Sequence, residues 1–194
     1  MYQTGTESIP DVKVFNTRIN PDERGALTPV FDAINFSIAT GFKDRFSQEI
    51  ETLSHKNVFR GLHYQTRNPQ GKLIRPTHGE ILDFAVDMRK WSPTFGTHVA
   101  KRLKAMAFQS IWIPPGFAHG YLTLSETSVV NYKLTAEWEP HHSEVLSWRY
   151  VQNYIGHALN DPFFAPILNW KDFQGKPFVE CKFYEKPEDL KCEF

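Results

Sequence analysis

Apolar and polar residues alternate in short runs along much of the chain. In residues 81–88, one set of alternating positions holds Leu82, Phe84, Val86 and Met88, and the other set holds Asp83 and Asp87. In residues 128–135, the positions that share one face are Val130, Tyr132 and Leu134. A period of two residues is typical of β-strands. Both segments are therefore predicted to be strands, and Tyr132 is predicted to point inward with its apolar neighbours.

Turn-forming residues separate the β-rich runs, at 20–22, 68–71, 92–96 and 114–116. Short strands at this spacing indicate an antiparallel β-sandwich or barrel. Helical patterns are weak: residues 44–53 could form one or two turns, and Pro187–Leu190 could begin a terminal helix. We expect one domain over residues 1–194, an all-β antiparallel barrel with a few short peripheral helices in its last third.

Composition and charge exclude several classes of protein. The chain has 41% hydrophobic residues, which argues against disorder. Its 22 basic residues balance 22 acidic ones, so no general charge attracts nucleic acid or an anionic membrane. The N-terminus lacks the pattern of a signal peptide, and no apolar run approaches the ~18 residues of a membrane span. Cys181 and Cys192 fit two reduced thiols, and a cytoplasmic location is expected.

The segment Pro114–His119 has the spacing Pro-x-Gly-x-x-His, which is one half of the metal-binding pattern of cupin jelly rolls. The other half needs a His-x-His pair with a nearby Glu. Here His63 is followed by Tyr64 and Gln65, so the second imidazole is missing. Too few nitrogen ligands remain for a divalent metal unless His78 or His119 converges with His63. The sequence thus favours a jelly roll, and no metal or other cofactor is expected.

Six motifs follow one another in a fixed order. They are Arg60–Gln65, Gly71–Lys72–Leu73, Val86–Lys90 with Ser92–Gly96, Pro115–Gly120, Tyr132–Lys133 with Thr135, and Pro166–Leu168 with Lys171–Asp172. Together they resemble the dTDP-4-dehydrorhamnose 3,5-epimerase family. The resemblance runs from about residue 22 to residue 172. It implies a jelly-roll homodimer that acts on a nucleoside-diphosphate 4-keto sugar without a redox cofactor.

The chemistry of such a substrate assigns roles to four residues. A ketone at C4 acidifies the protons on C3 and C5, so epimerisation needs a base, an acid and a cation for the enolate oxygen. His63 is the expected base, because imidazole titrates near neutral pH. The resemblance implies that Asp172 orients this imidazole, that Tyr132 is the acid, and that Lys72 faces the C4 oxygen. In each case the alternative is a structural role in the core or in a turn.

Four further residues are predicted to bind the substrate. Arg24 and Arg60 are the expected diphosphate contacts, because the guanidinium fork matches phosphate oxygens. Either could instead form a surface ion pair, for example with Glu23. Gln48 matches the glutamine of the family pattern and is expected to bind the substrate. His119 is expected to line the pocket, and the alternative is a hydrogen-bonded histidine of the barrel.

The family pattern is interrupted at 26–29, 49–53 and 149–151. Because these interruptions lie on the nucleotide side, they suggest the same proton chemistry on another nucleotide, such as CDP or GDP, or on another sugar. Whether C3, C5 or both are inverted stays open. The alternatives to an epimerase are a 3,4-ketoisomerase on a related cupin and a non-catalytic cupin that binds sugar nucleotides.

Overall fold

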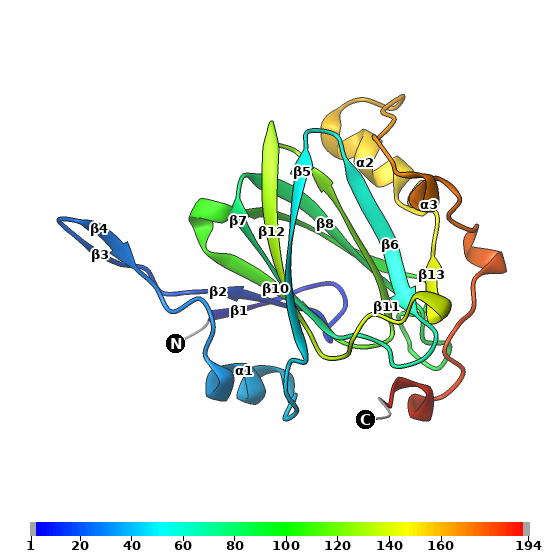
Figure 1. Cartoon of the computed structure of the whole chain (residues 1–194), viewed down its shortest axis with the longest axis horizontal. Helices are drawn as coiled ribbons and strands as arrows, with labels where there is room; N and C mark the ends of the chain where they lie inside the picture. Colours follow the sequence, from blue (N-terminus) through cyan, green and yellow to red (C-terminus); the bar gives the residue numbers. More distant parts are fainter. Residues whose placement is uncertain (1–2, 192–194) are drawn as a thin grey trace.

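Two antiparallel sheets face each other and form a barrel in the computed structural model, which describes residues 3–191 (Figure 1). The six-stranded sheet has the order β1 (Gln3–Thr6), β2 (Lys13–Asn16), β10 (Gln109–Ile113), β7 (Lys72–His78), β12 (Thr127–Leu134) and β5 (Gln48–His55). The five-stranded sheet has the order β13 (Ser143–Val145), β6 (Phe59–Gln65), β11 (Phe117–Thr123), β8 (Glu80–Asp87) and β9 (His98–Lys104). The antiparallel barrel confirms the predicted fold class.

A separate hairpin of β3 (Asn20–Asp22) and β4 (Gly25–Leu27) projects from the barrel (Figure 1). Its side chains are exposed on both strands. Because the hairpin pairs only with itself in the described part of the chain, its position is not fixed by the barrel's own sheets.

The helices are short and lie at the periphery. They are α1 (Ala33–Thr40), α2 (Gln152–Leu159), α3 (Trp170–Phe173) and the 3-10 helices η1 (Ala105–Ala107), η2 (Pro140–His142), η3 (Trp148–Tyr150), η4 (Phe178–Glu180) and η5 (Pro187–Leu190). Most follow residue 140, as predicted, and η5 begins at the predicted terminal position. Helix α1 was not predicted; the Asp32 side chain accepts from the Asn35 amide at its start, and Gly41 ends it at φ 74°.

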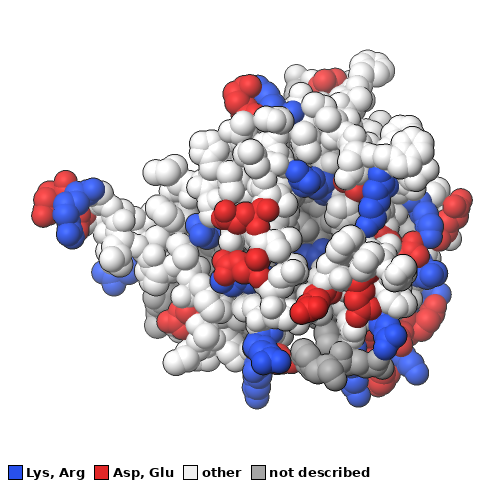
Figure 2. Space-filling view, viewed as in Figure 1, with Lys and Arg blue, Asp and Glu red and all other residues white. Residues whose placement is uncertain are grey.

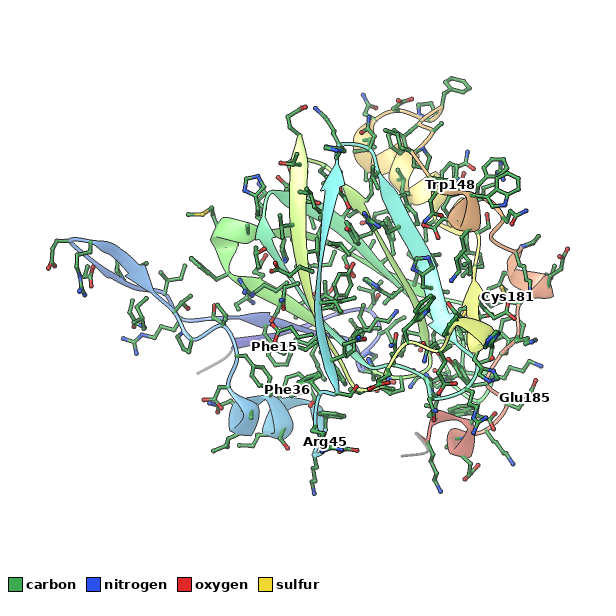
Figure 3. The ribbon with its side chains drawn as sticks, viewed as in Figure 1. Phe15, Phe36, Arg45, Trp148, Cys181 and Glu185 are labelled. Atoms are coloured by element: carbon green, nitrogen blue, oxygen red, sulfur yellow. The ribbon has the colours of Figure 1, made fainter. Side chains whose placement is uncertain are left out.

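Helix α1 covers an aromatic cluster at one end of the barrel. Phe15 of β2 and Phe36 of α1 lie together beside this helix (Figure 3), with ring centroids 5.6 Å apart. Trp112 of β10 meets Phe36 edge-on at 5.1 Å. Such contacts fix the helix against the six-stranded sheet.

The prediction of helical turns at 44–53 is wrong, because most of this segment forms β5. Every residue of β5 pairs with β12, from Gln48 with Leu134 to His55 with Thr127. The polar residues of this edge strand obscure its alternation in the sequence. The strands predicted at 81–88 and 128–135 are confirmed as β8 and β12.

Strand β8 is buried on both faces, although its sequence alternates. Leu82 and Phe84 pack on the side of the five-stranded sheet that faces the C-terminal segments. Ile81 and Ala85 belong to the core inside the barrel. Asp83 and Asp87 also lie in the interior and are fully buried. The alternation of β8 therefore separates two buried environments and does not mark a solvent face.

Charged side chains of both signs are interspersed over the face shown in Figure 2. No helix in residues 3–191 is long and apolar enough to cross a membrane. Cys181 is a free, buried thiol (Figure 3), and Cys192 lies outside the described residues.

Candidate active site

A cavity of about 280 Å³ opens between the two sheets and holds most of the predicted site residues. The predicted residues that line it are Gln48, Arg60, His63, Lys72, His119 and Tyr132. Figure 2 shows Lys and Arg atoms beside the hollow between β5 and β6. The barrel thus brings together residues that are up to 84 positions apart in the chain, since Gln48 and Tyr132 come from neighbouring strands.

The six-stranded sheet supplies one wall of the cavity through strand register. Leu134 pairs with Gln48 on one side and with Lys72 on the other. Tyr132 pairs with Ile50 in the next inward-facing row. Residues two positions apart on a strand face the same side. For this reason Gln48, Lys72 and Tyr132 reach one cavity, and Ile50, which was not predicted, also lines it.

The five-stranded sheet supplies the opposite wall, where His63 on β6 pairs directly with His119 on β11. The two strands approach closely at Gly120, where an added Cβ would lie 2.5 Å from the Arg60 carbonyl oxygen. The register shifts at this point, between His119 and Tyr121. Glycine at 120 therefore permits the close contact that holds the two histidines side by side.

His63 and Asp172 form a hydrogen-bonded pair. The His63 Nε2 lies 2.6 Å from Asp172 Oδ1, and the histidine side chain is 37% exposed against 1% for the aspartate. The second carboxylate oxygen accepts from the Gly61 amide at 3.3 Å. An ionised carboxylate only accepts, so Nε2 carries the proton and Nδ1 is left as an acceptor. This geometry suits a base whose active nitrogen is Nδ1.

Asp172 reaches His63 from a helix at the far end of the sequence. Asn169 caps the start of helix α3, and its Oδ1 accepts from the Asp172 amide at 2.7 Å. The segment before it contains α2. The cap holds the carboxylate within hydrogen-bond distance of the imidazole, so the structure brings together the predicted pair.

Lys72 is a buried cation in the cavity wall. Its Nζ donates to the His63 carbonyl oxygen at 3.2 Å. Burial lowers the pKa of Lys72 to about 8, and the charge of Asp83 opposes this effect. Lys72 is therefore mostly protonated at neutral pH and can stabilise an anion formed in the cavity.

His119 pairs with Asp83, a residue that the sequence reasoning did not select. The His119 Nε2 lies 2.8 Å from Asp83 Oδ2, and both side chains are almost inaccessible to solvent. Burial lowers the pKa of the imidazole and raises that of the carboxyl group. The only signal in the sequence was the position of Asp83 between the apolar residues Leu82 and Phe84 of a predicted strand.

Tyr132 faces the cavity from the sheet opposite His63 and is buried. Its ring centroid lies 6.0 Å from that of His119. Burial raises the pKa of Tyr132 well above its usual value. The phenol therefore keeps its proton at physiological pH and can act as a donor across the cavity from His63.

Arg60 lies at the edge of the cavity and is held from two directions. Its Nε donates to Ser54 Oγ at 2.8 Å, and its Nη2 donates to the Leu53 carbonyl oxygen at 3.0 Å. A guanidinium has five N–H donors, so others remain for a ligand. This arrangement suits the predicted contact with a diphosphate.

Arg24 lies outside the cavity of its own chain. It is on the projecting β3–β4 hairpin, where its side chain is 82% exposed and its Nη2 lies 2.7 Å from Asp22 Oδ2. The ion pair that it makes is with Asp22 instead of Glu23. Within one chain the structure does not bring Arg24 to the other site residues.

Trp138, Asn169 and Lys171 also line the cavity and were not selected from the sequence as ligand contacts. The Lys171 Nζ lies 5.6 Å from the centroid of the Trp138 ring. The Trp138 side chain is exposed, so an aromatic face and a cation are available to a ligand. Among residues 3–191, no group of three or more His, Cys, Asp or Glu side chains could hold a metal ion.

Comparisons of the sequence and of the structure with known proteins point to the same family. Residues 6–180 match the dTDP-4-dehydrorhamnose 3,5-epimerase family. The enzyme of that name from Pseudomonas aeruginosa is 43% identical over 89% of this chain and 94% of its own length.

Solved structures agree with the sequence match. The Legionella pneumophila dTDP-6-deoxy-D-glucose-3,5-epimerase, in complex with dTDP-4-keto-L-rhamnose, has a TM-score of 0.86 and 32% identity over 96% of this chain and 99% of that one. ChmJ, a 3'-monoepimerase from Streptomyces bikiniensis in complex with dTDP-quinovose, has a TM-score of 0.78 and 25% identity over 89% and 86% of the two chains. The matched relatives are isomerases that share the cupin-like jelly roll predicted here. The chain therefore belongs to the dTDP-4-dehydrorhamnose 3,5-epimerase family.

Proposed function

We propose that the chain inverts C3, C5 or both of a nucleoside-diphosphate 4-keto-6-deoxy sugar in deoxysugar biosynthesis. The observation that carries this proposal is the placement of His63, paired with Asp172, and Tyr132 on opposite walls of one cavity. The names of the relatives support the substrate class.

The proposed reaction is a proton exchange through an enolate. His63 Nδ1 removes the proton next to the C4 ketone. The electron pair of that C–H bond forms the C=C bond of the enolate, and the π pair of the C=O bond moves onto the C4 oxygen. The Lys72 ammonium stabilises this oxygen, and Tyr132 delivers a proton to carbon from the other face. His63 then releases its proton to solvent and Tyr132 regains one, so the reaction needs no redox cofactor.

A 3,4-ketoisomerase would also use an enolate, but it would move the carbonyl group. An NMR spectrum of the product separates the two reactions. The proposed epimerase returns a C4 ketone with inverted configuration at C3 or C5, and a ketone at C3 would identify the isomerase. A protein that only binds sugar nucleotides has no need of a His–Asp pair opposite a buried tyrosine.

We propose thymidine diphosphate as the nucleotide of the substrate. The relatives act on, or were solved with, dTDP-linked ligands by name. Of the three segments that depart from the family pattern, residues 26–29 and 149–151 lie outside the cavity of this chain. Ile50 and Thr52 of the third segment do line it. Among the departures from the family pattern, only those on strand β5 can therefore contact a nucleotide in this cavity.

A thermal-shift screen of dTDP, CDP and GDP tests the choice of nucleotide. A ligand that binds only the folded state stabilises it by RT ln(1 + [L]/Kd), which is about 2.7 kcal/mol at a hundred times Kd. For a chain of this size that corresponds to about 5–10 °C. We expect dTDP to give the largest shift at equal concentration. A shift with CDP or GDP and none with dTDP would establish the altered specificity instead.

We propose that the chain is a homodimer in which the β3–β4 hairpin serves the second copy. Arg24 lies on the β3–β4 hairpin that projects from the barrel (Figure 1) and does not line the cavity of its own chain, so it can contact a diphosphate only in the cavity of a neighbouring chain. The exposed Leu27 on the same hairpin supports burial against a partner.

Mixing two impaired variants tests this arrangement. In a heterodimer of Arg24→Ala with His63→Ala, one site would receive an intact His63 and an intact Arg24. Random reassembly of equal amounts should therefore recover about a quarter of the wild-type sites. The activity is measured at a substrate concentration below KM, where Arg24→Ala alone has low activity. Activity no greater than the sum of the two variants would show that Arg24 does not act across the dimer.

We also propose a cytoplasmic location. Cys181 is a free thiol, and thiols stay reduced in the cytosol. Cell fractionation with an antibody to the chain would test this location.

A further inference from the structure

Asp83 is a buried carboxylate behind the cavity that the proposed reaction does not use. It lies on β8 and is 0% exposed. Its Oδ2 accepts from His119 Nε2 at 2.8 Å. Its Oδ1 has no hydrogen-bond partner within residues 3–191. Buried carboxylate oxygens are normally paired, so an unpaired one calls for a reason beyond packing.

Lys72 is a second buried charged side chain, and it lines the cavity together with His119. Titratable side chains that line the same cavity as Lys72 include His119 from β11, His63 from β6 and Tyr132 from β12. Asp83 of β8 is bonded to His119. The histidines and the tyrosine bring no negative charge while Tyr132 keeps its proton. The carboxylate of Asp172 is already bonded to His63. Asp83 is thus the anion that acts on the Lys72 ammonium.

One arrangement of protons leaves the cluster of Lys72, Asp83 and His119 neutral and still gives Lys72 its charge. Lys72 is protonated, Asp83 is ionised, and His119 is neutral with its proton on Nε2, where the bond to Asp83 holds it. An isolated buried charge is costly, whereas a balanced pair is tolerated. Loss of the Asp83 charge would leave the Lys72 ammonium buried without a counter-ion.

We propose that Asp83 is a positioning residue that supplies the counter-charge of Lys72 and fixes the orientation of His119 for stabilisation of the enolate. This inference deepens the proposed epimerase function and rests on it for its catalytic meaning. The charge relation between the two side chains is a property of the protein without substrate.

The expected effect of removing the charge has a definite sign. The protonated lysine is the active form, so activity falls as the pH rises through the pKa of Lys72, which is about 8. Desolvation favours neutral lysine, and the Asp83 charge opposes it. In Asp83→Asn the desolvation acts alone, so Lys72 should lose its proton at a lower pH.

The test is an NMR titration of the lysine ε-CH₂ groups in ¹³C-lysine-labelled protein, with the Lys72 signal assigned by its loss in Lys72→Arg. We expect the Lys72 midpoint to fall by about one pH unit or more in Asp83→Asn, the size of effect that a close opposite charge produces. The alkaline limb of kcat/KM should move with it. Asp44→Asn removes an exposed carboxylate and should leave both unchanged.

An unchanged Lys72 midpoint in folded Asp83→Asn would overturn the proposal, whether or not the protein proves to be an epimerase. If Asp83→Asn does not fold, the wild-type spectra still decide. Neutral Lys72 at pH 7, or a His119 ring protonated on Nδ1 alone in a ¹⁵N-histidine spectrum, contradicts it. A protonated Lys72 with the His119 proton on Nε2 supports it. If the Lys72 midpoint falls as expected in Asp83→Asn but the wild-type protein turns over no 4-keto sugar, the proposed function is refuted and the charge pair stands.

Discussion

The variant His63→Ala is expected to lose between about a hundredfold and ten-thousandfold in kcat/KM, the range that a positioned acid or base contributes. That loss corresponds to about 2.7–5.4 kcal/mol of transition-state stabilisation. The physical reason is that Nδ1 of His63 is the basic nitrogen that the Asp172 hydrogen bond leaves free in the cavity. Both epimerisation and exchange of substrate protons with solvent should disappear together, because both begin with the same abstraction.

The matched control is His157→Ala, which removes an exposed histidine on α2. It should keep wild-type rates and the wild-type melting temperature. His63 is partly exposed and makes its side-chain bond to one partner, so its alanine variant should also fold. Full exchange in folded His63→Ala would remove this residue as the base.

The variant Tyr132→Phe is expected to separate exchange from inversion. The ring that fills the buried position stays, and only the phenolic proton donor is lost. Epimerisation should fall by about a hundredfold or more, the contribution of a general acid. Exchange at the carbon that His63 deprotonates should fall much less, because His63 can return a proton to the same face.

Deuterium incorporation and product configuration, measured on the same sample by NMR and mass spectrometry, check this division of roles. Tyr154→Phe makes the same chemical change at an exposed position and should have no effect. Equal loss of exchange and epimerisation in Tyr132→Phe would show that the tyrosine is not a separate acid.

Local sequence patterns predicted the barrel because strand alternation is a property of neighbouring residues. Val130, Tyr132 and Leu134 alternate in the sequence and point inward in β12, as expected. Strand β5 escaped prediction because it is an edge strand whose exposed face carries Glu49 and Glu51. Such a strand gains its structure from pairing with β12, which lies about 80 residues further along the chain.

The candidate site was predictable where a motif carries the residue and not where tertiary packing decides its surroundings. His63, Lys72 and Tyr132 lie in motifs, and the structure brings them to one cavity. Asp83 looked like the polar side of an alternating strand. Both faces of β8 are covered, so Asp83 lies in the interior instead. Its pairing with His119 is visible only in the three-dimensional structure. Arg24 lies on the β3–β4 hairpin, which pairs only with itself within residues 3–191, so the barrel does not bring it to this cavity.

The most direct test of the central claim is solvent exchange in wild-type enzyme with a thymidine-diphosphate 4-keto-6-deoxyhexose in deuterated water. A base and an acid on opposite walls, with Lys72 stabilising the enolate, predict deuterium at C3, at C5 or at both, with inversion at an exchanged centre and the ketone still at C4. Product that shows no deuterium at either carbon, or that carries its ketone at C3, would contradict the account.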